Sequence, residues 1–139
     1  MGSNDLLPHD GGSLGVFHGA MTYILQDDEG QISNPSSIAA GLDYPGVGPQ
    51  LASWKDTGSA TFIAATGDEP LRAFHTLAQL EGIIPCLESS HVIWGGMKVA
   101  STMKEDETLV ICLSGRGAKD PQVVAGTHAA PSQPGDCVN

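Results

Sequence analysis

Basic side chains are scarce in this sequence. Six Lys and Arg stand against sixteen Asp and Glu, for a formal net charge of −10 over 139 residues. Nucleic-acid binding needs a basic surface, and anionic membranes attract basic clusters, so this balance argues against both partners. No apolar run approaches the roughly 18 residues of a membrane helix, and residues 1–5 lack the basic and apolar regions of a signal peptide. We expect a soluble, cytoplasmic protein.

Cysteine is scarce as well, and familiar catalytic motifs are missing. The three cysteines, Cys86, Cys112 and Cys137, show no paired spacing, which excludes a disulfide framework and the usual type of zinc site. Cys86 and Cys112 lie in apolar runs, where a buried structural thiol is the ordinary outcome. A reducing compartment fits this usage. The sequence also lacks a P-loop and a Gly-x-Ser-x-Gly motif.

The chain contains enough apolar residues to form a hydrophobic core. Hydrophobic residues make up 40% of the chain and charged residues 16%, which is too apolar for a disordered protein. The length allows one modest domain. Residues 1–13 are polar and predict a tail or a truncated end, whereas residues 127–139 predict a disordered tail. The folded domain is expected over residues 14–126.

Strand and helix signals alternate along this domain. The periodicity predicts helices over about 50–56 and 88–104 and a third that runs from a start at residues 66–69 to residue 81. Strands are predicted over 21–26 (in a hairpin with 31–32), 60–66, 83–85 and 109–113. Thr66 to Glu69 has the form of a capping box, and Gly82 is expected to end the helix that follows. The order strand, helix, strand, helix, strand predicts an α/β fold of three layers, with a mostly parallel sheet flanked by helices.

Ligands of such sheets bind beyond the carboxyl ends of the strands. The last predicted strand is followed by Ser114-Gly115-Arg116-Gly117, where glycines allow close approach and a hydroxyl can form hydrogen bonds. A ligand contact and an ordinary glycine-rich turn both fit this pattern. Glu88 lies in the first turn of a helix, where it either complements the helix dipole or points into a cleft.

Four longer blocks resemble the tryptophan synthase β family, and they occur in the family's order. Three of them are residues 41–49 (Gly-Leu-Asp-Tyr-Pro-Gly-Val-Gly-Pro), 80–91 (Leu-Glu-Gly-Ile-Ile-Pro-Cys-Leu-Glu-Ser-Ser-His) and 113–117 (Leu-Ser-Gly-Arg-Gly). The fourth, residues 15–32, resembles the fungal, fused type. The resemblance implies the C-terminal part of a fold-type II pyridoxal-phosphate enzyme. Such an enzyme is a lyase of tryptophan biosynthesis that condenses L-serine with indole to L-tryptophan.

The resemblance also implies which residues meet the cofactor. Ser114 matches the serine whose hydroxyl contacts the pyridine nitrogen of pyridoxal phosphate, and Gly115 and Glu88 match residues near the cofactor. The family's Schiff-base lysine has no counterpart here, because the context of that lysine matches none of Lys55, Lys98, Lys104 and Lys119. No catalytic residue is therefore assigned, and this chain alone is expected to be inactive.

Further expectations concern a metal, a switch and partners. Leu42, Tyr44 and Gly46 match positions whose backbone carbonyls hold a monovalent cation, and Asp43 matches an aspartate that pairs with an arginine when the site closes. The implied partners are the α subunit or a fused α domain, serine and indole as substrates, and a second β subunit. The alternative interpretation is a degenerate, non-catalytic paralogue that serves as a binding or structural module.

Overall fold

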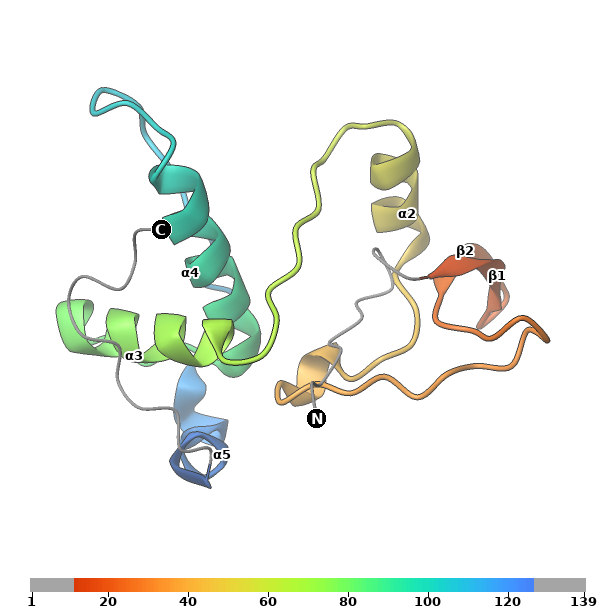
Figure 1. Cartoon of the computed structure of the whole chain (residues 1–139), viewed down its shortest axis with the longest axis horizontal. Coiled ribbons are helices and arrows are strands. Elements are labelled where there is room, and N and C mark those ends of the chain that lie inside the picture. Colours follow the sequence, from red (N-terminus) through yellow and green to blue (C-terminus); the bar gives the residue numbers. More distant parts are fainter. Residues whose placement is uncertain (1–11, 127–139) are drawn as a thin grey trace. The chain divides into compact units, whose positions relative to one another are not determined.

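The computed structural model describes residues 12–126 and divides the chain into two compact units, with the boundary after Ala64. The first unit contains β1 (Ser13–Phe17), β2 (Ala20–Ile24), η1 (Ala40–Leu42) and α2 (Pro49–Asp56). The second contains α3 (Glu69–Glu81), α4 (Leu87–Ala100), η2 (Gly117–Lys119) and α5 (Pro121–Gly126) (Figure 1). The expectations for residues 1–11 and 127–139 lie outside the described part. Each unit is described by itself.

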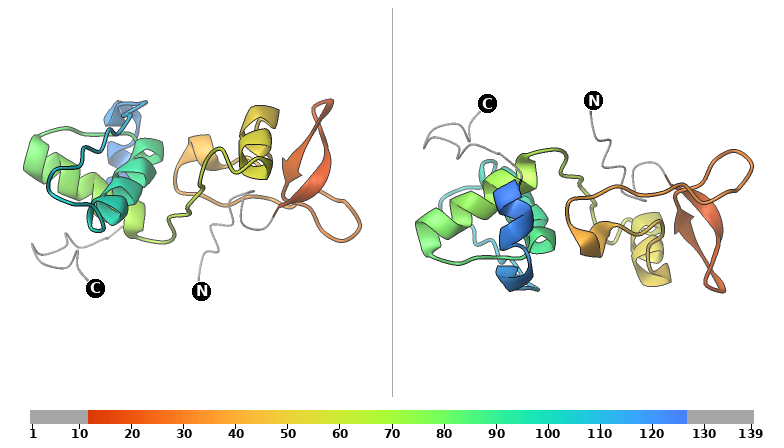
Figure 2. Two further views of the ribbon diagram at one scale, coloured as in Figure 1. Left: turned by 90° about the horizontal axis from the view of Figure 1, so that it is seen from above. Right: turned by 90° about the horizontal axis from the view of Figure 1, so that it is seen from below.

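The first unit is built on an antiparallel hairpin. Strand β1 pairs with β2 in a register that sets Phe17 against Ala20 (Figure 2). His18 and Gly19 form the turn with φ values of 49° and 77°, the signs that a type I′ hairpin turn requires. The sequence did not predict β1. The expected hairpin of residues 21–26 with 31–32 is present as the isolated bridge between Gln26 and Ile32.

Helix α2 contacts strand β2 in this unit. The Thr22 hydroxyl donates to the Val47 carbonyl at 2.6 Å, which ties the buried strand to the segment leading into the helix. Pro49 begins the helix, where a missing N–H costs nothing, and Gly58 follows its end with a φ of 65°. The prediction for this helix is confirmed. The buried residues of the unit are Thr22, Ile24, Leu25, Ala39 and Ala52.

The second unit is centred on the packing of α3 against α4 (Figure 1). The Glu69 carboxylate accepts the Thr66 backbone N–H at 2.7 Å, one half of the expected capping box, and Gly82 ends α3 in the left-handed conformation. Helix α4 ends at Ala100, four residues earlier than predicted. The core residues of the unit are Ala65, Leu71, Ala73, Phe74, Cys86, Leu87, Ile93 and Val124.

The predicted parallel sheet is not observed. Helix and strand are both present, but the sheet that the described residues form is the two-stranded antiparallel one. Residues 60–66 and 109–113 belong to no strand, and 83–85 contributes one bridge, between Pro85 and Arg116. A strand exists only through hydrogen bonds to a neighbour, and the apolar segments here leave side chains in water: Val110 is 88% exposed.

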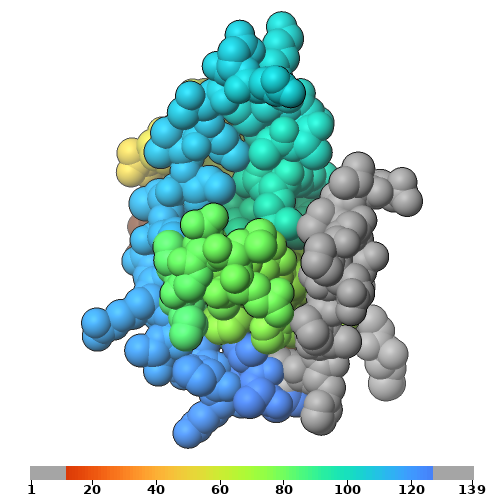
Figure 3. Space-filling view, turned by 90° about the vertical axis from the view of Figure 1, so that its left-hand side faces the viewer, coloured from red at the N-terminus to blue at the C-terminus, as the bar shows by residue number. Residues whose placement is uncertain are grey.

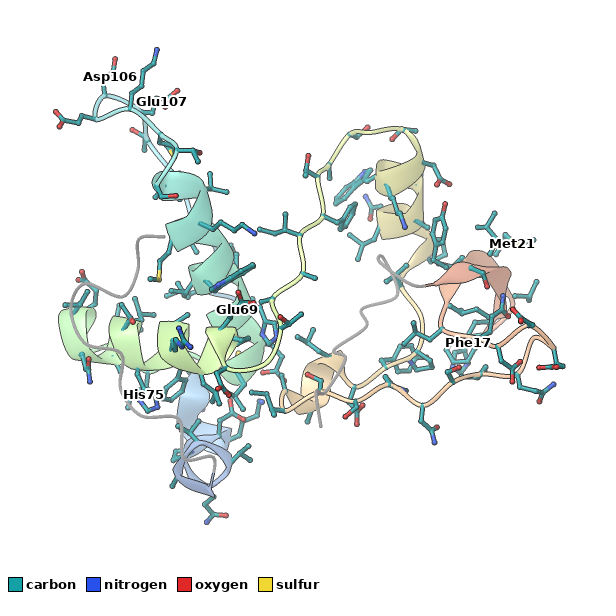
Figure 4. The ribbon with its side chains drawn as sticks, viewed as in Figure 1. Phe17, Met21, Glu69, His75, Asp106 and Glu107 are labelled. Atoms are coloured by element: carbon teal, nitrogen blue, oxygen red, sulfur yellow. The ribbon has the colours of Figure 1, made fainter. Side chains whose placement is uncertain are left out.

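Two smaller observations concern burial. Cys86 is buried, as expected, whereas Cys112 is exposed, contrary to the expectation from its apolar neighbours. Helix α4 buries Ile93 and Gly96, whereas its apolar residues Val92 and Val99 are exposed. Figure 3 shows one face of the second unit, with α3 in green beside the chain that follows α4.

Within residues 12–126 no helix is long and apolar enough to cross a membrane.

Candidate ligand loop at the start of helix α4

The loop of residues 114–120 is fixed by backbone hydrogen bonds to the segment that leads into α4. The Cys86 N–H donates to the Gly115 carbonyl at 3.1 Å, and the Gly117 N–H donates to the Ile84 carbonyl at 3.0 Å. A Cβ on Gly115 would lie 2.6 Å from the Cys86 sulfur, so this approach requires glycine. The loop therefore lies directly beside the first turn of the helix.

Side chains of that first turn reach the serine of the loop. Ser89, buried to 1% exposure, has an Oγ that accepts the Gly115 N–H at 3.2 Å and the Cys86 thiol at 3.3 Å. The same Oγ lies 3.2 Å from the Ser114 Oγ. Either of these two hydroxyls can be the donor in that contact.

A charged cluster of Lys119, Asp120 and Glu88 lies at the C-terminal end of the loop. The Lys119 ammonium donates to both Glu88 carboxylate oxygens, at 3.1 and 3.0 Å, and to Asp120 Oδ1 at 2.8 Å. The hydrogen bonds to Asp120 and then to Glu88 raise the pKa of Lys119 to about 12. The other oxygen of Asp120 accepts the Leu87 N–H at 3.0 Å, one of the amides that a helix start leaves without an internal partner.

Asp120 is expected to stabilise this arrangement measurably. Asp120→Ala leaves the buried Leu87 N–H without its acceptor and removes one of the two carboxylate partners of Lys119, which we expect to lower the free energy of unfolding by about 2 kcal/mol. Urea unfolding of the 139-residue chain, followed by circular dichroism, measures the change. Asp106→Ala, in an exposed turn, is the control. An equal effect of both substitutions would remove the proposed anchoring role.

Of the three residues that the sequence assigned to the cofactor, two contact Ser89, and the carboxylate of the third contacts Lys119. Ser114 and Gly115 contact Ser89, and Glu88 is the preceding residue of the same helical turn. Sequence reasoning missed Ser89, Lys119 and Asp120. Their signals were present as the serine pair that follows Glu88 and the Lys-Asp pair that follows the glycines.

The residues assigned to the cation and the switch lie in the first unit. Leu42 ends η1 and its carbonyl accepts the Tyr44 N–H at 2.9 Å, while Gly46 bridges to Ile24. Asp43, between them, is exposed. The described residues hold no cluster of three His, Cys, Asp or Glu side chains fit for a metal. A site of backbone carbonyls needs no such cluster, and this assignment stays a prediction.

Three of the four lysines make side-chain contacts within the described residues. Lys119 is held between two carboxylates with a raised pKa, so its amine stays protonated at neutral pH and is a poor nucleophile. Lys55 lies 4.2 Å from the ring centroid of Tyr23, and Lys98 lies 4.9 Å from that of Trp94, both in cation–π geometry.

The described residues thus define a mixed helix-and-strand protein with a Ser-Gly loop fixed to the start of a buried helix. No protein-family model matches the chain. The chain is 60% identical over 114 residues to a protein of Saccharomyces cerevisiae named tryptophan synthase. This match covers 82% of the chain and 16% of the yeast protein. The chain is a homologue of a segment of tryptophan synthase, and the family resemblance of its sequence is confirmed.

Proposed function

We propose that this chain is the part of a tryptophan synthase that contacts the pyridine ring of pyridoxal phosphate in the β-type reaction. That reaction condenses L-serine with indole to L-tryptophan. The observation that carries the proposal is the Ser114 hydroxyl, which lies on a glycine loop beside a helix start, 3.2 Å from the Ser89 Oγ. An unprotonated pyridine nitrogen is a hydrogen-bond acceptor, so the two groups are complementary. The similarity to the yeast protein supports the choice of reaction.

The residues present suit this cofactor in two respects. Ser114 offers a neutral donor, which leaves the ring a weaker electron sink than a carboxylate partner would. Gly115 allows the loop to lie against Cys86 and Ser89, because no Cβ stands there, and this close packing holds Ser114 beside the helix start. When bound, pyridoxal phosphate supplies the electron withdrawal that activates the substrate's bonds. The lysine that binds the cofactor would lie in a part of the enzyme outside this 139-residue chain.

The proposal extends to the fold and to the partners. The apolar segments 60–66, 83–85 and 109–113, which form no strand among the described residues, would join a parallel sheet in the complete enzyme. The exposure of Ile63, Ile84 and Val110 supports this. A monovalent cation at the 42–46 loop, a closing role for Asp43, an α subunit or fused α domain, and a second β subunit belong to the same proposal.

A chimera tests the proposed function. Residues 14–126 of this chain replace the homologous stretch of the yeast tryptophan synthase, and tryptophan formation from serine and indole is measured with pyridoxal phosphate present. We expect the chimera to make tryptophan. Ser114→Ala in the chimera removes one neutral hydrogen bond and should weaken cofactor binding about fivefold to tenfold.

Ser36→Ala, an exposed serine in a loop of the first unit, is the matched control and should change nothing. A folded chimera that binds no pyridoxal phosphate would contradict the proposal. That result would favour the interpretation of a non-catalytic binding or structural module.

A further inference from the structure

Ser89 occupies an unusual place in the ligand loop. It is a buried polar residue, 1% exposed, in the first turn of α4 (Leu87–Ala100). Its backbone N–H donates to the Cys86 sulfur at 3.4 Å, and that thiol donates back to the Ser89 Oγ at 3.3 Å. This exchange at the helix start fixes the position of the Ser89 hydroxyl oxygen.

The neighbouring Ser90 is just as buried but has a different partner. Its exposure is 0%, and its hydroxyl donates to the Cys86 carbonyl at 3.0 Å, the usual back-bond of a serine within a helix. That hydrogen bond remains within the helix start and does not reach the loop. Ser90 therefore has the environment of Ser89 without the contact to Ser114, and the two residues form a natural pair for comparison.

Ser89 also determines the direction of the hydrogen bond to Ser114. The Gly115 amide has one possible role, as a donor, and it points at the Ser89 Oγ from 3.2 Å. Together with the Cys86 thiol it uses both acceptor positions of that oxygen. Ser89 can then only donate to Ser114, 3.2 Å away. Among residues 12–126, Ser114 Oγ forms no other hydrogen bond that would compete for its proton.

We propose that Ser89 is a positioning residue that orients the Ser114 hydroxyl as a donor and so disfavours a protonated ring on the ligand. This rests on the proposed function, in which the Ser114 hydroxyl meets the pyridine nitrogen of pyridoxal phosphate. A hydrogen bond from Ser89 occupies one of the two acceptor positions of the Ser114 oxygen and polarises the Ser114 O–H as a donor. Without the proton from Ser89, both acceptor positions are free, and the hydroxyl accepts more readily from a protonated ring. Ser89 then controls the protonation of the ring without touching it.

The test uses the chimera loaded with pyridoxal phosphate that carries nitrogen-15 in its ring. The nitrogen-15 chemical shift, followed across pH, reports whether the ring nitrogen is protonated, and cofactor affinity is measured in parallel. We expect Ser89→Ala to make the ring take up its proton at a higher pH than in the parent chimera. Affinity should fall about tenfold, the equivalent of one hydrogen bond. Ser90→Ala should leave the titration unchanged.

Ser89→Cys is a second variant for the case that Ser89→Ala does not fold, because it keeps the size of the side chain while weakening its hydrogen bonds. We expect it to shift the titration in the same direction as Ser89→Ala, by a smaller amount. If Ser114→Ala moves the titration and neither Ser89 variant does, the role of Ser89 is refuted and the proposed function stands. If Ser114→Ala does not move it either, both proposals fall.

Discussion

Replacing Gly117 with alanine should lower the free energy of unfolding of this chain by about 3 kcal/mol. Gly117 is buried, and a Cβ there would collide with the carbonyl oxygen of Pro85 and lie 2.7 Å from Cγ2 of Ile84. The obstacle is mainly backbone, which cannot rotate away as a long side chain can. Overpacking of this kind typically costs about 1–3 kcal/mol, and a collision with backbone belongs at the upper end.

The effect of Gly117→Ala is measured by urea unfolding of the 139-residue chain, followed by circular dichroism. The control is Gly126→Ala at the end of α5, where a Cβ meets nothing within 4 Å among the described residues. That substitution should be neutral or slightly stabilising, because alanine restricts the unfolded chain more than glycine does. An unchanged midpoint for Gly117→Ala would show that the loop is not packed against residues 84–86 as described.

The helices were predictable because their signals are local. Pro49 and Gly58 bracket α2, and the pair Thr66 and Glu69 marks the start of α3, which Gly82 ends. Each signal acts within one or two turns of the residue that carries it. The end of α4 was misplaced because no glycine or proline marks it in the sequence between Ala100 and Lys104.

The strands were less predictable because a strand depends on a distant neighbour. Residues 109–113 have the composition of a buried strand, yet Val110 is 88% exposed. Strand β1 was missed because its turn, His18 and Gly19, lacks the Asn-Gly or Asp-Gly pair that usually indicates a hairpin. An apolar run therefore indicates an extended segment, but its hydrogen-bond partner depends on the rest of the protein.

The candidate site shows the same difference between local signals and long-range contacts. Ser114 and Glu88 were found from their places after a predicted strand and at a predicted helix start. The contacts that join them link residues 25 to 33 positions apart, such as Ser89 with Ser114 and Leu87 with Asp120. Sequence spacing carries no information about which of two neighbouring serines faces the loop. The structure supplies that choice, in favour of Ser89 over Ser90.

Ser114→Asp in the chimera should redirect the chemistry rather than merely weaken it. A carboxylate beside the ring nitrogen is a charge-assisted acceptor and holds the nitrogen protonated. It also reverses the polarity of the proposed contact, because the serine hydroxyl would donate to the ring nitrogen whereas a carboxylate can only accept. Protonation makes the ring a stronger electron sink, so transamination products should rise relative to tryptophan. A hydrogen bond to a charged group is worth about 2 kcal/mol, which corresponds to about a 30-fold slower formation of tryptophan.

The redirection is measured as the ratio of pyruvate and transamination products to tryptophan, beside the absorbance spectrum of the enzyme with serine. Ser114→Ala is the matched variant, since it removes the same donor without adding charge and should weaken cofactor binding while leaving the product ratio unchanged. Ser36→Asp adds the same charge at an exposed loop of the first unit and should change neither quantity. Identical spectra and product ratios for Ser114→Asp and the parent chimera would mean that Ser114 does not contact the ring nitrogen. The Ser114 hydroxyl would then have no acceptor on the cofactor, and its proposed role as a donor would be wrong.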